Sequence, residues 1–456
     1  MLRKPLPHQT QLEMVTLEGL VPKDHLLRKI DAVIDFSFIH ERVAGLYCAD
    51  NGRPALDPTL MFKALFVGYL FGIRSERQLV REIEVNVAYR WFLGLGLSDP
   101  VFDASTLSQN RRRRYTDTSV AQDIFDQIVE QAIGHGLVDG TVLYTDSTHL
   151  KANANKNRFD QAVIAKSRSD YWDDLDQAVA EERAAHGQKP LPERQRRPAE
   201  KQTKVSRTDP ESGYMVRDGK PKGFFYLDHR SVDGRLGIIT DTYATPANVH
   251  DSIVYLGRLD RQRERFGFDT KAAGLDAGYA TTGIAKGLED RRILGVTGYR
   301  RPTPPRRGMM ASKAFAYESA LDGYRCPEGQ LLAYATTDRN GYRHYRSDPA
   351  ICRACPLLAS CTANPKAERT IVRHVWAEAR ERTDAHRLTP WGKAIYKRRK
   401  ETVERSFADA KQLHGHRYAR FRGLIGVACQ CLIAATAQNI KKIALALALR
   451  HAPNPA

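Results

Sequence analysis

The sequence contains no long, uninterrupted apolar run, and this absence narrows the class of protein. Residues 1–20 are polar and lack the apolar core of a signal peptide, so we expect a cytoplasmic protein. The most apolar stretch, 424–449, is interrupted by polar side chains such as Gln430, Asn439 and Lys441. Because a bilayer penalises such residues heavily, we predict a buried helix there and no contact with a membrane.

Acidic residues are scarce relative to basic ones. The 456 residues include 71 Lys and Arg but 53 Asp and Glu, which gives a formal net charge of +18. A basic surplus favours a polyanionic partner, because each Lys or Arg that contacts a phosphate releases counterions. We therefore expect DNA as the partner, with a merely soluble basic protein as the alternative.

No internal repeat is evident, and the length allows about two to four domains.

Cysteine is also sparse, with seven in the chain, and four of these lie between residues 326 and 361. Cys352 and Cys355 are separated by two residues, as in a metal-binding knuckle, and Cys326 and Cys361 flank them. The spacing predicts a structural zinc ion held by four thiolates. Unliganded cysteines or a redox role are the alternatives, and disulfides are not expected in the cytoplasm.

The first 139 residues have the pattern of an all-α, DNA-binding domain. Asp57 and Pro58 suit the cap and the first position of a helix, and a second helix is expected over 76–89. Ser105 or Thr106 is expected to cap a further helix that ends in a run of arginines. Short helices ending in a basic cluster are typical of helix-turn-helix proteins, although a solvent-exposed charged face is the alternative. The residues expected to contact DNA here are Arg111, Arg112, Arg113 and Arg114.

From residue 140 the pattern changes to short β-like runs alternating with helices. This pattern predicts an α/β sheet domain over 140–298, with a hairpin at 224–243 and a polar insertion at about 151–213. The insertion reads as partly helical around 171–182. Regularity is lost over 299–392, the segment that holds the cysteine cluster, and a helical pattern returns over 393–456.

Three acidic residues stand out by their settings. Asp146 and Asp276 each end a short apolar run, and Glu404 lies inside the helical stretch 400–407. Two divalent cations about 4 Å apart, held by carboxylates on rigid elements, are what metal-dependent phosphoryl transfer needs. Lys400, Glu404 and Lys411 are expected on one helix face. Each clue is weak alone, because aspartates also cap turns and a charged helix face is ordinarily solvated.

Together these settings resemble the DDE transposases of bacterial insertion sequences, of the IS5 and IS1182 types within the IS4-type superfamily. The matching stretches are 56–114, 145–148, 248–252, 276–279 and 400–407 with Lys411. The resemblance implies an RNase H-like catalytic core with an insertion before the last catalytic helix. It also implies that Asp146, Asp276 and Glu404 hold two Mg²⁺ (or Mn²⁺) ions for DNA cleavage and strand transfer.

The same resemblance implies the partners and the alternatives. The partners would be double-stranded DNA, as element ends with terminal inverted repeats and as target, in a homodimer or larger synaptic complex. Such a protein would be nucleoid-associated when bound to DNA. A domesticated or decayed copy that binds DNA without cutting it, and a nuclease without strand transfer, remain as alternatives.

This chain keeps only part of the family's tyrosine, arginine, glutamate and lysine signature. Lys400 stands where an arginine is usual, and Tyr396 lies one residue further from it than expected. Asp251 is an alternative second acid, although it precedes a helix and resembles an N-cap. Beside the acids, the residues expected to contact DNA are Lys400, Lys411, His414 and Arg417.

Overall fold

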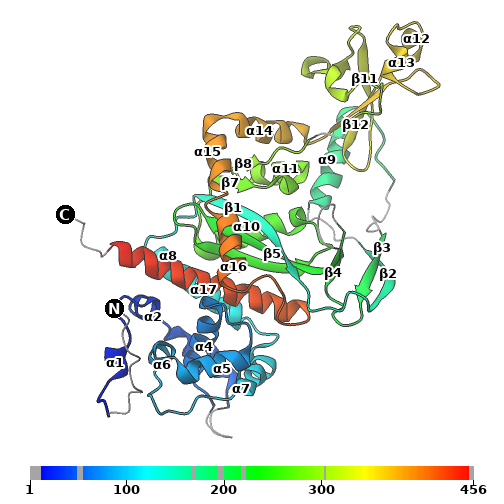
Figure 1. The fold of residues 1–456 in the computed structure, drawn as a ribbon. Helices are drawn as coiled ribbons and strands as arrows, with labels where there is room; N and C mark the ends of the chain where they lie inside the picture. Colours follow the sequence, from blue (N-terminus) through cyan, green and yellow to red (C-terminus); the bar gives the residue numbers. More distant parts are fainter. Residues whose placement is uncertain are drawn as a thin grey trace, which may run out of the picture.

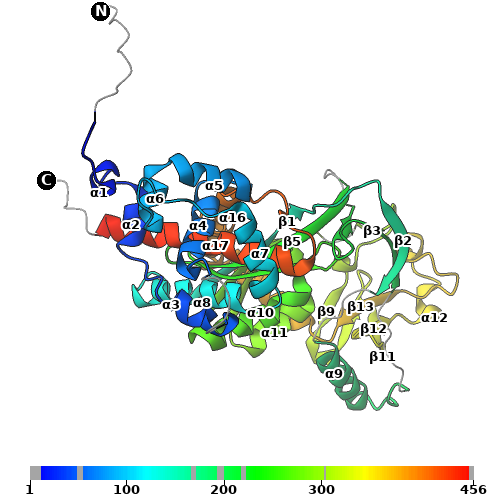
Figure 2. The same ribbon diagram turned by 90° about the horizontal axis from the view of Figure 1, so that it is seen from below.

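The structure, a computed structural model, describes residues 12–48, 55–165, 171–192, 200–216, 222–301 and 304–450. It is a mixed α/β fold in which a long helix near the C-terminus separates a group of N-terminal helices from a six-stranded sheet (Figure 1). A second, five-stranded sheet lies at the end of the molecule remote from the N-terminal helices in both Figure 1 and Figure 2.

The N-terminal region is helical, as the sequence predicts. Its elements are α1 (Leu17–Leu20), α2 (Leu26–Asp31), α3 (Phe38–Val43), η1 (Ala44–Leu46), α4 (Pro58–Leu70), α5 (Glu76–Val85), α6 (Val87–Leu93), α7 (Ala104–Asn110), the π-helical turn η2 (Arg111–Tyr115) and α8 (Val120–Gly134). Asp57 caps α4 by accepting hydrogen bonds from the N–H groups of Thr59 and Leu60, with Pro58 at the start of the helix.

Two details of this region differ from expectation. The single helix expected over 76–89 is two helices, because Asn86 leaves the helical conformation and its side chain caps α6. The cap of α7 is Asp103, which accepts from the Ser105 N–H, and neither Ser105 nor Thr106 has that role.

The six-stranded sheet is built around one central strand. Its strands are β1 (Val142–Lys151), β4 (Gly213–Met215), β5 (Gly223–Asp233), β6 (Ile239–Pro246), β7 (Ala272–Leu275) and β8 (Leu294–Thr297). The order is β4-β5-β1-β7-β8, and β6 also pairs with β5. β1 runs antiparallel to β5 and parallel to β7, and β7 runs parallel to β8. The hairpin predicted at 224–243 is therefore confirmed as β5 and β6.

Helices connect these strands, as the alternating pattern predicts. They are α10 (Asp251–Phe266), η3 (Ala277–Tyr279) and α11 (Thr282–Asp290). Within the polar insertion, β2 (Phe159–Ala165) pairs with β3 (Glu200–Ser206), and α9 (Trp172–Ala185) confirms the helix expected there.

The segment expected to lack regularity contains the five-stranded antiparallel sheet. Its elements are η4 (Ser312–Ala314), β9 (Ala316–Glu318), η5 (Ser319–Leu321), β10 (Gly323–Arg325), β11 (Leu331–Thr337), β12 (Tyr342–Arg346), α12 (Pro349–Cys352), α13 (Leu358–Cys361) and β13 (Thr370–His374). The expectation fails because these strands are short and their pairing is with one another. Helical structure then resumes earlier than predicted, with α14 (Ala377–Leu388) and α15 (Pro390–Arg398), and α14 packs against β8 and α11.

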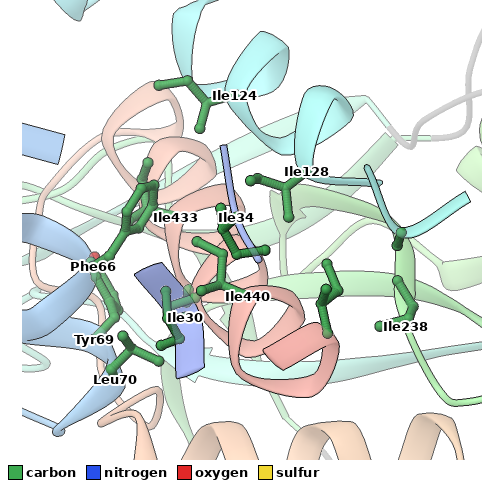
Figure 3. Close-up of a cluster of buried hydrophobic side chains, with 14 of the residues drawn as sticks. Ile30, Ile34, Phe66, Tyr69, Leu70, Ile124, Ile128, Ile238, Ile433 and Ile440 are labelled. Atoms are coloured by element: carbon green, nitrogen blue, oxygen red, sulfur yellow. The ribbon is translucent and has the colours of Figure 1, made fainter. Parts of the chain in front are cut away.

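The last two helices are α16 (Val403–Leu413) and α17 (Leu424–Arg450). α17 is long and apolar enough to cross a membrane, but 61% of its most apolar window is buried inside the protein. Its Ile433 and Ile440 lie among Ile30, Phe66 and Ile124 of the N-terminal helices (Figure 3). α17 also packs on β6, so the predicted buried helix is confirmed as the core element between the helices and the sheet.

Two polar residues of α17, Gln430 and Asn439, are buried and hydrogen-bonded. The Asn439 side chain accepts from the Ile239 N–H at 2.8 Å and donates to the Ile239 carbonyl at 2.7 Å. Gln430 accepts from the Arg420 N–H at 2.7 Å and donates to the Tyr418 carbonyl at 3.0 Å. These residues therefore hold α17 to β6 and to the loop that follows α16, because a buried backbone group needs a hydrogen-bond partner.

Candidate active site

Asp146 and Asp276 meet where the parallel pair β1 and β7 ends. Asp146 does not end its strand, as the sequence suggested, but lies within β1 opposite Arg230 of β5. The pairing of β1 with β7 stops at Thr145 and Leu275, and Asp276 follows at once. Both carboxylates therefore leave the sheet at the carboxyl ends of these two strands, where ligands of open α/β sheets commonly bind.

Glu404 reaches the same place from α16, of which it is the second residue. Val403 and Phe407 are buried and fix this helix against Tyr144 and other core residues. Phe407 thus anchors the helix in the core. Asp276 and Glu404 are about half exposed, whereas Asp146 is largely buried.

One guanidinium lies among the three carboxylates. Arg399 is 4% exposed, and its Nη2 donates to Asp146 Oδ2 at 2.6 Å. Its Nη1 lies 3.9 Å from Asp276 Oδ1 and 3.6 Å from Glu404 Oε1. The structure thus brings together the three acids that the sequence singled out, around a cation that sequence reasoning missed.

Arg399 takes the place that was assigned to Lys400. It lies one residue nearer to Tyr396, which is the spacing expected of the signature arginine, and its Nη1 is 3.5 Å from the Tyr396 hydroxyl. Lys400 is exposed and lies between α15 and α16. The prediction that it shares a helix face with Glu404 and Lys411 is therefore wrong.

The chain between Arg399 and Glu404 is one residue longer than a regular helical spacing, and this explains why Lys400 was expected in the place of Arg399. The Glu404 N–H donates to the Arg399 carbonyl five residues back, at 3.0 Å, where a regular helix bonds four residues back. Thr402 has φ −105° and ψ −98°, outside helical geometry. Counting back from Glu404 as if the helix were continuous therefore reaches the wrong side chain.

The environment of Asp146 disfavours its negative charge. Burial raises the pKa of this carboxyl to about 6, against the lowering effect of Arg399, and the neighbouring charges of Asp276 and Asp251 raise it further. The charged form of Asp146 thus needs positive charge beside it.

Asp251, the alternative second acid, also borders the site. It is the first residue of α10, but the cap of that helix is His250, which accepts from the Ser252 N–H, so the N-cap expectation for Asp251 is wrong. The Ser147 hydroxyl donates to Asp251 Oδ1 at 2.9 Å.

The residues expected to contact DNA near the acids differ in exposure. Lys411 is partly exposed in the last turn of α16, and Arg417 is exposed in the loop that follows. His414 is 2% exposed, and its Nδ1 lies 2.8 Å from the Tyr69 carbonyl. Burial lowers the pKa of His414 to about 4. It is a neutral core residue, so the expectation that it touches DNA is corrected.

The arginine run lies on the π-helical turn η2 and not on a regular helix. Arg111 pairs with Glu76 and stacks 4.0 Å from the Phe421 ring, while Arg114 contacts Asn110 and stacks 4.5 Å from the Tyr47 ring. Arg112 and Arg113 are exposed. Arg111 and Arg114 therefore make contacts within the protein, whereas Arg112 and Arg113 face the solvent.

The four clustered cysteines lie in and beside the five-stranded sheet, all partly buried. The Gly329 N–H donates to the Cys326 carbonyl at 2.8 Å, and the Cys355 N–H donates to the Cys352 carbonyl at 3.1 Å. Burial raises the pKa of Cys361, and the thiols of Cys352, Cys326 and Cys355 raise it further, so the four are neighbours.

The sulfur atoms of these cysteines lie farther apart than the ligand atoms of a single metal ion. Among the described residues, the groups in which three ligand atoms lie within 4.8 Å of one another are Asp228, His416 and Cys431, and Glu182, His186 and Asp322. Asp228 is already paired with Arg230, and Glu182 with Arg343. Neither group therefore has the open negative charge of the acidic site.

Two family models match the chain. The transposase domain DUF772 matches residues 15–113, and the transposase DDE domain matches residues 325–444. The second match includes Glu404 and the cysteine cluster but lies beyond Asp146 and Asp276. No curated protein matches the sequence.

Among solved structures, a piggyBac transposase synaptic complex with hairpin DNA is similar to the chain. The identity is 10% and the TM-score 0.30, over 94% of this chain and 82% of that one.

Proposed function

Because this chain belongs to the DDE transposases, we propose that it binds the terminal inverted repeats of its own insertion sequence and catalyses metal-dependent DNA strand cleavage and strand transfer. The observation that carries the proposal is the meeting of Asp146, Asp276 and Glu404 around Arg399, from elements far apart in the chain. Such a convergence of carboxylates has no structural need in the sheet, because like charges held close together repel one another.

Asp146, Asp276 and Glu404 would hold two divalent cations, Mg²⁺ or Mn²⁺. Carboxylate oxygens are the ligands that these hard cations prefer, and a bound cation would offset the burial that raises the pKa of Asp146. When bound, such a pair activates the attacking oxygen and stabilises the leaving oxygen of a phosphodiester.

The chain's own residues would position the DNA around these acids. Arg399 supplies a rigid guanidinium beside them, and exposed Lys400 and Arg417 with partly exposed Lys411 extend the basic surface. Arg112 and Arg113 would contact phosphates from the N-terminal region. We propose an RNase H-like core, supported by the order of strands, with a hairpin on one side of β1 and the parallel strands β7 and β8 on the other.

Joining two element ends implies a homodimer or larger synaptic complex, and DNA as substrate implies work in the cytoplasm, on the nucleoid. A nuclease without strand transfer shares every feature of the site, and product analysis separates the two. A decayed copy that only binds DNA is disfavoured because all three carboxylates are present and face one cation.

A labelled duplex that carries the element end tests the proposal. Asp146→Ala, Asp276→Ala and Glu404→Ala should each abolish Mg²⁺-dependent cleavage while DNA binding is kept, because the acids would hold cations and not DNA. Asp409→Asn, on the same helix as Glu404 and paired with Arg405, is the matched control and should cut normally. A variant that retains full cleavage would remove its residue from the site.

We also propose a structural zinc ion on Cys326, Cys352, Cys355 and Cys361. The five-stranded sheet buries few apolar side chains, among them Leu332, Tyr345 and Ile371, so a metal cross-link would add needed stability. Zinc analysis of the purified protein should find one ion per chain, lost in Cys352→Ser and kept in Cys48→Ser. Equal zinc content in the two variants would overturn the assignment.

A further inference from the structure

Asp251 lies close enough to Asp146 for its charge to raise the pKa of that carboxyl. Its side chain is 15% exposed, and its Oδ1 accepts from the Ser147 hydroxyl at 2.9 Å. Ser147 pairs with His229 across β1 and β5, and His229 Nδ1 lies 3.8 Å from the same oxygen. Asp251 is therefore held against the residue that follows Asp146.

The other carboxylate oxygen faces the turn that carries Asp276. A β-carbon built at Gly278 would lie 3.8 Å from Asp251 Oδ2, so that oxygen is next to the backbone two residues beyond Asp276. The charges of Asp251 and Asp146 also act together on Tyr279: burial raises the pKa of its hydroxyl well above the usual value, and these two carboxylates raise it further. Asp251 thus lies close both to Asp146 and to the turn that begins at Asp276.

Two buried polar groups near Asp251 are available to a bound ion and its water molecules. His229 and Tyr279 are almost fully buried, and in the described part of the chain neither the His229 Nδ1 nor the Tyr279 hydroxyl has a hydrogen-bond partner. Buried polar groups are nearly always bonded to protein, water or ligand. An ion with its water molecules is a ligand that could satisfy both.

The charge balance points the same way. Asp146, Asp276 and Glu404 share the single guanidinium of Arg399. In the described part of the chain, the ion-pair contact of Asp251 is with His229 Nδ1, at 3.8 Å, and not with a Lys or Arg. Four carboxylates beside one positive charge leave a deficit that divalent cations would fill.

We propose that Asp251 is a fourth carboxylate of the active site and supplies an oxygen ligand to a divalent cation shared with Asp146 and Asp276. This inference rests on the proposed function, and it assigns Asp251 a role beside the second acid, Asp276, and not in its place. Ser147 would then be a positioning residue that orients the Asp251 carboxylate through Oδ1 and leaves Oδ2 toward the cation.

Mn²⁺ binding to the whole, DNA-free protein tests this assignment, followed by electron paramagnetic resonance of the free ion. Asp251→Asn keeps the shape and the acceptor for Ser147 but removes the charge, and it should weaken Mn²⁺ binding about tenfold or more, because affinity follows ligand charge. Glu264→Gln, at an exposed position of the same helix, is the matched control and should bind like wild type. Thermal unfolding of each variant checks that it folds.

Ser147→Ala distinguishes a metal-binding role of Asp251 from a purely structural one. If Asp251 binds the cation, Ser147→Ala should weaken Mn²⁺ binding only about two- to threefold, since the charge remains. Equal losses in Ser147→Ala and Asp251→Asn, or none in Asp251→Asn while Asp146→Asn loses binding, would overturn the fourth ligand and leave the proposed function intact. Absence of Mn²⁺ binding by the wild type would overturn both.

Discussion

The Arg399 guanidinium donates a 2.6 Å hydrogen bond to Asp146, although 253 residues separate the two in the chain. The donor follows α15 and the acceptor lies within the central strand, so this one bond joins the two halves of the acidic site. Arg399 provides the positive charge that the acids need when no other cation is beside them.

Arg399→Gln should make the protein depend on divalent cations for stability. Without the guanidinium the carboxylates repel one another, and a bound cation then contributes more to the folded state than in wild type. We expect a lower Tm in EDTA and a larger rise with Mg²⁺ than wild type shows. The same Mg²⁺-induced shift in both proteins would show that Arg399 does not balance these charges.

The buried pair of Asp228 and Arg230 should be essential to the core. Both are fully buried, and Asp228 also accepts from Thr242 at 2.7 Å and lies 2.8 Å from His416 Nε2. Although burial opposes it, Arg230 and His416 lower the pKa of Asp228 far below its usual value. Arg230→Met should cost about 3–5 kcal/mol in urea unfolding, because it leaves a buried charge unpaired.

The double variant is the control for that pair. Arg230→Met with Asp228→Asn removes both charges and should be more stable than Arg230→Met alone. If the double variant is the less stable of the two, the pair is not the source of the effect.

His414 predicts a specific pH dependence of stability. Its pKa is about 4 when folded and near the usual 6.5 when unfolded, so between these values the unfolded chain binds a proton that the folded chain does not. Stability should be unaffected above pH 6.5 and fall as the pH drops below it. Relative to His414→Gln, wild type should lose about 1 kcal/mol more between pH 7.5 and 5.5. Parallel losses in urea unfolding would contradict the buried, neutral state.

Asn439 should be irreplaceable by an apolar residue. Asn439→Leu leaves both the N–H and the carbonyl of buried Ile239 without their partner, which should cost about 2–3 kcal/mol despite the higher apolarity of the helix. Leu445→Asn, a change of opposite chemistry on an exposed position of the same helix, should be nearly neutral. Calorimetric unfolding measures both.

Local patterns predicted the elements better than their extents. The β5–β6 hairpin follows from alternating apolar residues and the turn at Asp233 and Gly234, which are local signals. The continuation of β1 past Asp146 is not local, because it depends on pairing with β5 to Lys151 while β7 stops beside Thr145. The apolar run therefore identified Asp146, but the prediction that Asp146 ends the strand was wrong.

The site was found through its acids, and its cation was missed. Arg398, Arg399 and Lys400 are consecutive basic residues, and sequence alone gives no sign that the middle one is buried. The bond from Glu404 to the Arg399 carbonyl, which skips one residue, breaks the spacing rule of a regular helix. The distance from Tyr396 was the one available signal for Arg399.

The measurement that tests the central claim most directly is joining of a labelled element-end duplex to target DNA by wild type and by Glu404→Ala, with Mg²⁺ and with EDTA. We predict joined product for wild type with Mg²⁺ only, and none for the variant at equal DNA binding. Cleavage without joining would indicate a nuclease, and product that persists in EDTA or in Glu404→Ala would contradict the metal-dependent acidic site.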